Sequence, residues 1–90
     1  MKTVLPLLAE YLGTFLISLA LLSSSNVLFV GVIFTVILYL ILPVSGAAIN
    51  PAISLLYYLK GSLGVREAIL YSVIQVIAAV SSYYTYAYLA

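Results

Sequence analysis

Residues 45–53 read Ser-Gly-Ala-Ala-Ile-Asn-Pro-Ala-Ile and contain the most informative local pattern of the chain. Asn50 is a favourable N-cap residue and Pro51 is favourable at the first helical position, so a helix is predicted to begin here. Gly46 allows the tight turn that precedes it. The predicted helix, residues 51–59, is apolar but reaches only ~14 Å, about half of a bilayer's hydrocarbon core.

The composition of the whole chain indicates a membrane protein. Hydrophobic residues make up 67% of the 90 residues and charged residues only 6%, whereas soluble domains carry about 25% charged residues. Residues 11–59 and 68–90 contain no charged side chain. We therefore expect lipid to surround the protein. The net charge of +1 offers no basis for binding nucleic acid.

Three segments are long enough to cross a bilayer, which takes ~20 apolar residues. Helices are expected because every backbone polar group in lipid must be satisfied locally. Polar or proline-containing breaks separate the segments. The predicted transmembrane helices are 4–22, 27–43 and 67–89.

The short helix has two interpretations that its length does not separate. It could lie flat among the headgroups, or it could enter to the midplane and return. The second arrangement requires that its inner end be buried in protein or face water. A helix N-terminus carries about half a positive charge. At the midplane it would attract the oxygen of a neutral solute and repel a cation.

The inventory of reactive side chains argues against catalysis. The chain has no Cys and no His, which removes thiol chemistry and the common zinc sites. Only two carboxylates are present, so acid–base or nucleophilic catalysis is not expected. We expect no enzyme activity, no cofactor and no metal.

Polar and small residues recur every four positions on the long helices, which places them on one face. Glu10 could reach the membrane interface or accept hydrogen bonds from an irregular loop, and Gln75 could support the same loop. The small residues predict close helix packing. They are Gly13, Gly31, Thr35 and Ala79.

Several motifs together resemble the aquaporin, or major intrinsic protein, family. Residues 45–52 resemble the family's SGAxxNPA signature, and residues 9–15, Ala-Glu-Tyr-Leu-Gly-Thr-Phe, are similar to its first-helix motif. Residues 65–68, followed by Tyr71 and Gln75, resemble the start of its third helix. The resemblance covers nearly the whole chain and corresponds to one N-terminal-type half of a six-helix channel.

The resemblance implies an all-α integral membrane protein, with residues 1–90 forming one half-channel domain of three transmembrane helices and a re-entrant half-helix, 51–59. It implies that two inverted halves pair to form a passive pore for water or small neutral solutes such as glycerol. The implied pore motif is Asn50, Pro51 and Ala52. The implied loop supports are Glu10, Gln75, Ser45 and Gly46, and the implied selectivity constriction is Val30 and Ile53.

Two departures qualify the implied mechanism. The family's filter arginine follows its second Asn-Pro-Ala motif, whereas Ile53 occupies that position here, and Val30 replaces a typical bulky aromatic. A constriction without a cationic donor favours a broader neutral-solute pore. The alternative is a non-transporting structural or assembly protein that retains the half-fold.

The distribution of basic residues predicts one orientation. Lys2 precedes the first span, and Lys60 and Arg66 precede the last, so all three fall on one side. The positive-inside rule then places the N-terminus in the cytoplasm. The expected partner is a second copy, in a dimer of halves or a higher homo-oligomer, or a complementary half. An inverted homodimer needs both orientations, which three basic residues disfavour without preventing, and a parallel homo-oligomer is a further alternative.

Overall fold

The computed structural model describes residues 3–90, which form four helices and no strand. Three of these helices are long and apolar enough to cross a membrane, and the fourth is a nine-residue helix. The predicted all-α class is therefore confirmed. The helices are α1 (Val4–Ser23), α2 (Val27–Ser45), α3 (Pro51–Leu59) and α4 (Val65–Leu89).

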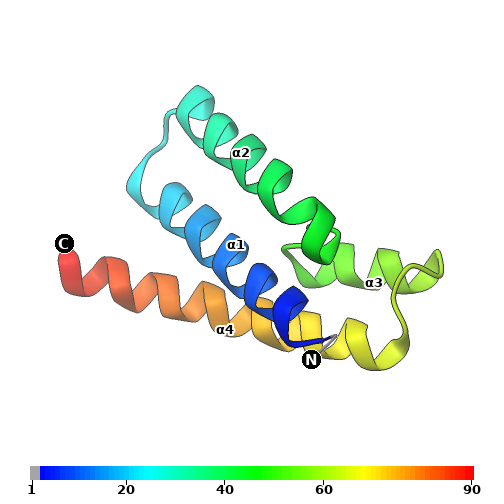
Figure 1. Cartoon of the computed structure of the whole chain (residues 1–90). Coiled ribbons are helices and arrows are strands. Elements are labelled where there is room, and N and C mark those ends of the chain that lie inside the picture. Colours follow the sequence, from blue (N-terminus) through cyan, green and yellow to red (C-terminus); the bar gives the residue numbers. More distant parts are fainter. Residues whose placement is uncertain (1–2) are drawn as a thin grey trace.

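The helices are arranged around α1. It packs against both α2 and α4, and α3 packs against α4 (Figure 1). The first two helices run antiparallel, and α4 crosses beneath them at an angle. The short α3 lies alongside the first part of α4. Ser54 in α3 contacts Gln75, near the middle of α4, so α3 begins at about half the height of the bundle.

Three helix bounds differ from the sequence-based prediction. The first helix ends at Ser23, one residue beyond its predicted end. The second helix continues through Pro43 to Ser45, where the prediction ended it at residue 43. Proline removes only the hydrogen bond to the carbonyl of Tyr39, and the helix ends instead at Gly46, which adopts a left-handed conformation at φ 85°. The last helix begins at Val65 rather than at residue 67, because Gly64 accepts the first helical hydrogen bond from Ala68.

The prediction that small residues allow close packing is confirmed at one position. A Cβ on Gly13 would lie 2.6 Å from Ile41 Cδ1, so α1 and α2 approach closely there. Gly31 has no atom within 4 Å of such a Cβ, and Thr35 and Ala79 are exposed. At these three positions the packing prediction is wrong within the subunit.

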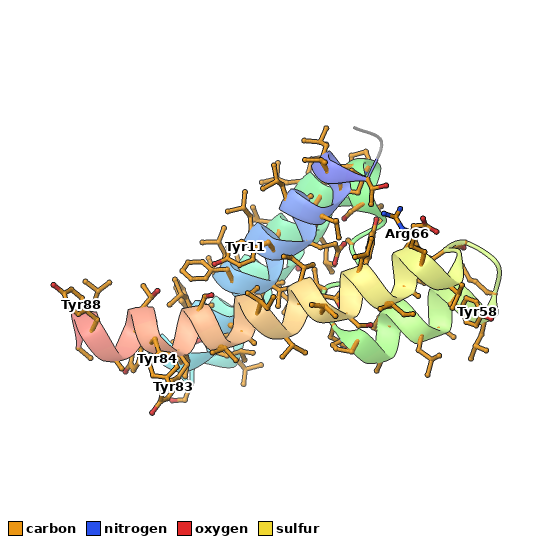
Figure 2. The ribbon with its side chains drawn as sticks, turned by 90° about the horizontal axis from the view of Figure 1, so that it is seen from below. Tyr11, Tyr58, Arg66, Tyr83, Tyr84 and Tyr88 are labelled. Atoms are coloured by element: carbon orange, nitrogen blue, oxygen red, sulfur yellow. The ribbon has the colours of Figure 1, made fainter. Side chains whose placement is uncertain are left out.

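The two ends of the bundle carry different side chains. Figure 2 shows Tyr58 and Arg66 at one end and Tyr83, Tyr84 and Tyr88 at the other. The three C-terminal tyrosines are 54%, 67% and 89% exposed, which suits side chains at the level of the headgroups. The separation of these groups fits a bundle that crosses a bilayer lengthwise.

Candidate functional site

The loop between α2 and α3 has an irregular backbone. Gly46 has φ 85°, and the non-glycine residues Ala47 and Ile49 both have φ 53°. Left-handed conformations are uncommon outside glycine and persist only where surrounding contacts hold them. Ala47, Ala48 and Ile49 are nevertheless buried, so the loop depends on polar partners from the helices.

Glu10 supplies the main set of these contacts. Its Oε1 accepts hydrogen bonds from the Ile49 backbone N–H at 2.7 Å and from Gln75 Nε2 at 2.9 Å. Its Oε2 accepts from Ser45 Oγ at 2.5 Å and from the Ala48 backbone N–H at 3.1 Å. The Glu10 side chain is fully buried, so it does not reach out to the membrane interface.

The four groups that face Glu10 explain how a carboxylate can sit inside a membrane helix. Each of them donates to it, and charge-assisted hydrogen bonds are roughly twice as strong as neutral ones. Two donors are backbone N–H groups that an irregular loop would otherwise leave unpaired. The carboxylate and the loop therefore satisfy one another.

A second chain of hydrogen bonds joins α3 to the same centre. Ser54 Oγ lies 3.0 Å from Gln75 Oε1 and 3.1 Å from the Asn50 carbonyl oxygen. Both Ser54 and Gln75 are buried. Sequence reasoning missed Ser54, although its position four residues after Asn50 places it on the face of α3 that carries the cap.

Three more hydroxyl groups hold the carbonyls of the loop. Thr14 Oγ1 donates to Ile49 O at 3.2 Å, and Tyr71 Oη donates to Ser45 O at 3.1 Å. Tyr57 Oη donates to Gly46 O at 3.1 Å. Tyr57 is half-buried beside the loop, a contact that its place near the end of α3 did not reveal. No buried side-chain polar atom within residues 3–90 lacks a partner.

The tip of α3 contrasts with this closed network. Asn50 Oδ1 accepts from the Ile53 backbone N–H at 3.1 Å and caps the helix. Asn50, Pro51 and Ala52 are all exposed. Within residues 3–90 the amide nitrogen of Asn50 donates to no protein atom. The tip therefore presents free donors at about mid-height of the bundle.

An open cavity of about 370 Å³ lies beside this tip. Its wall is mostly apolar, with a few uncharged polar groups. The polar residues are Thr14, Ser18, Asn50 and Gln75, and the apolar ones include Ile17, Phe34, Val76 and Val80. Such a wall suits a small uncharged solute rather than an ion.

The two residues expected to form the constriction do not line this cavity. Val30 is half-buried and lines a separate hollow of about 350 Å³ near the turn between α1 and α2. Leu21 lines both hollows, so they adjoin. Ile53 is half-buried in the first turn of α3, where its N–H donates to Asn50. The subunit alone thus brings Asn50, but not Val30 or Ile53, to the cavity.

Comparison with known families fits this geometry. The sequence model of one family, described as major intrinsic protein, matches residues 2–89. The chain belongs to the major intrinsic protein family. Members of this family are membrane-embedded channels for water or small solutes and not enzymes. No curated protein and no solved structure matches the chain.

Membership of the major intrinsic protein family, together with the three long apolar helices, makes this an integral, multi-pass membrane protein. The family match extends over α1, α2, α3 and α4. It therefore includes the buried network around Glu10 and the exposed tip at Asn50.

Proposed function

We propose that this protein is a half-channel subunit that pairs with an inverted half to form a passive pore for water or small neutral solutes such as glycerol. Asn50, Pro51 and Ala52 form this half's contribution to the pore. Glu10, Gln75, Ser45 and Gly46 hold the loop that carries them. The N-terminus lies in the cytoplasm.

The observation that carries this proposal is the exposed amide of Asn50 at mid-height of a lipid-embedded bundle. An amide donor left unpaired in hydrocarbon costs several kcal/mol, about 4–8 kcal/mol on a water-to-cyclohexane scale. Irregular backbone at membrane depth is tolerated only against protein or a watery cavity. The α3 tip therefore requires water or a polar counterpart in front of it, which a paired half would enclose.

The expected solute is neutral. The N-terminus of α3 presents a partial positive charge, and the cavity beside it contains no charged side chain. A cation would lose hydration without gaining a negative partner, whereas a hydroxyl oxygen can accept from the Asn50 amide. The apolar Ile53 and the modest size of Val30 favour a pore wide enough for a small polyol as well as for water.

The proposal is tested by reconstituting the purified chain into liposomes from detergent, which allows both orientations to insert. Stopped-flow light scattering would record osmotic shrinkage, and swelling in a glycerol gradient would record solute entry. We expect permeability above that of protein-free liposomes. Asn50→Ala should reduce it, whereas Val36→Ala on the exposed face of α2 should leave it unchanged. Permeability equal to that of protein-free liposomes, with correctly folded protein, would overturn the proposal.

A second candidate is a structural membrane protein that keeps the half-fold without transport. The observation that favours it is that Ile53, which follows Asn50-Pro51-Ala52, gives this chain no cationic donor at the tip of α3. Equal permeability of protein-containing and protein-free liposomes, with an intact helical fold, is the result that this alternative predicts.

A further inference from the structure

The cavity beside the tip of α3 has four polar residues in its wall, and they differ in whether their hydrogen bonds are already used. Thr14 Oγ1 donates to a loop carbonyl, and both ends of the Gln75 amide are paired inside the bundle. The other two are Ser18 in α1 and Asn50 at the tip of α3. These two residues, which come from different elements, have polar groups that are free to bind a solute.

The hydroxyl of Ser18 forms no hydrogen bond with any atom of residues 3–90. A helical serine or threonine can donate to the carbonyl four residues earlier, and Ser23 in α1 and Thr35 in α2 do so. Ser18 is half-buried and lines the cavity. Because no buried side-chain polar atom of the described residues is unpaired, the Ser18 oxygen is accessible. It can both donate and accept a hydrogen bond.

Ser18 lies along the cavity from the α3 tip rather than at the tip itself. It is one helical turn, about 5.4 Å, further along α1 than Thr14, whose hydroxyl contacts the residue before Asn50. Leu21, three residues after Ser18, lines both this cavity and the adjoining hollow at Val30. Along α1, Ser18 therefore lies between the α3 tip and the second hollow.

We propose that Ser18 is a specificity-determining residue of the pore, whose hydroxyl pairs with one hydroxyl of a polyol while the Asn50 amide donates to another. This inference rests on the proposed channel function and identifies a second solute-binding residue of the same site. A polyol that fills the cavity displaces water, so a hydroxyl without a partner in the wall loses a hydrogen bond. Water in the same cavity can replace a lost contact with neighbouring waters, so it depends less on Ser18.

The first test measures glycerol and water permeability on the same liposomes. Ser18→Ala removes the hydroxyl and leaves more space, whereas Ser18→Cys replaces it with a larger and weaker donor. The loss of one hydrogen bond predicts that both variants lower glycerol permeability about 2- to 10-fold and water permeability less than about 2-fold. Ser81→Ala is the matched control and should change neither, because Ser81 is a half-buried serine of α4 outside the cavity.

Three results of this test would overturn the inference. Opposite effects of Ser18→Ala and Ser18→Cys would show that the width of the cavity, and not a hydrogen bond, determines passage. Equal losses for glycerol and water would show that Ser18 does not discriminate between them. Unchanged permeability of both variants would show that no solute contacts the hydroxyl. In each case the original protein still conducts, so the proposed function would stand.

The second test does not depend on transport. Because the chain has no cysteine, Ser18→Cys gives a single thiol, which reacts as the thiolate and is therefore slow in apolar surroundings. A small, neutral, water-soluble methanethiosulfonate is applied to the liposomes in glycerol or in sodium chloride of equal osmolarity. Glycerol held at Ser18 should slow the reaction relative to salt. Leu16→Cys, exposed on α1 outside the cavity, is the control and should react slowly in both solutions.

The reaction rates separate a failure of this inference from a failure of the proposed function. Equal rates for Ser18→Cys in glycerol and in salt would overturn the inference, whether or not the liposomes conduct. Protection by glycerol in liposomes that do not conduct would support polyol binding at Ser18 and count against the channel.

Discussion

Two polar regions lie at similar height in this bundle, and they differ in how their hydrogen bonds are completed. Around Glu10 every buried side-chain donor and acceptor within residues 3–90 has a partner from the same chain. At the α3 tip Asn50 is exposed, and its amide nitrogen donates to no atom of residues 3–90, although its Oδ1 caps the helix. The hydrogen bonds around Glu10 stabilise the fold, because lipid cannot replace a lost hydrogen bond. The free donors at the α3 tip require water or a polar partner from outside the subunit. Substitutions should therefore separate stability from transport.

The largest loss of stability is expected from Glu10→Ala. It leaves two loop N–H groups and the donors of Ser45 and Gln75 without an acceptor. Each buried donor left without an acceptor costs about 1–3 kcal/mol, and this substitution affects four of them. Thermal unfolding in detergent micelles, followed by circular dichroism, measures the change. Glu67→Ala is the matched control and should cost about 0.3–1 kcal/mol, because Glu67 lies only in the first turn of α4.

Gly13→Ala tests the close approach of α1 that supports the loop. The new Cβ would lie 2.6 Å from Ile41 Cδ1 and 3.2 Å from Ile37 Cγ2, so the Ile41 side chain must turn away and Ile37 must shift. Overpacking of this kind costs about 1–3 kcal/mol. Gly31→Ala is the control, since its Cβ meets nothing within 4 Å. Equal unfolding temperatures for the two variants would contradict the packing described for α1.

Ser54→Ala tests the link between α3 and the centre. It leaves Gln75 Oε1 without its donor, and an unsatisfied buried acceptor costs about 1–3 kcal/mol. We expect a loss near the lower limit of this range, with α3 loosened from α4. Ser62→Ala, exposed in the connection before α4, is the control and should unfold like the original protein. Faster hydrogen exchange confined to the loop and α3 would locate the effect; unchanged exchange there would argue against the link.

The smallest change in stability and a clear change in transport are expected from Asn50→Asp. Aspartate caps a helix about as well as asparagine, so the unfolding free energy should change by less than about 0.5 kcal/mol. The substitution replaces the two amide donors by an acceptor with a negative charge. Liposome assays should show altered discrimination between neutral solutes and cations. A large loss of stability with unchanged selectivity would contradict the proposal, because it would make Asn50 a residue that stabilises the fold rather than one that acts in transport.

The sequence was sufficient for the helix count because capping and hydropathy act locally. Asn50 and Pro51 predicted the start of α3, and the uncharged runs predicted the three long helices. It was insufficient at Pro43, because a proline near the end of a helix loses one hydrogen bond without ending it, and Gly46 ends α2 instead.

The sequence predicted the types of residue that form the candidate site, but not which of them contact one another. A carboxylate at position 10 and an amide at position 75 were expected to need partners. In the structure Glu10 accepts from the loop, and Gln75 donates to Glu10. Ser54 and Tyr57 were missed, because one hydroxyl in an apolar helix looks the same whether it faces lipid or a buried amide. Gly13 and Gly31 are both glycines within long apolar helices, but they have different neighbours, a difference that only tertiary structure determines.

The proposed pore requires that the α3 tip lie at mid-depth of the membrane and face water. Electron paramagnetic resonance of a nitroxide on Ala52→Cys, with Val36→Cys on the lipid-exposed face of α2 as reference, tests both parts. We expect the two labels to lie at the same depth, and only the label at Ala52 to be relaxed by a water-soluble nickel complex. A label at Ala52 that lies at headgroup depth, or that is relaxed only by oxygen dissolved in lipid, would contradict the proposed pore.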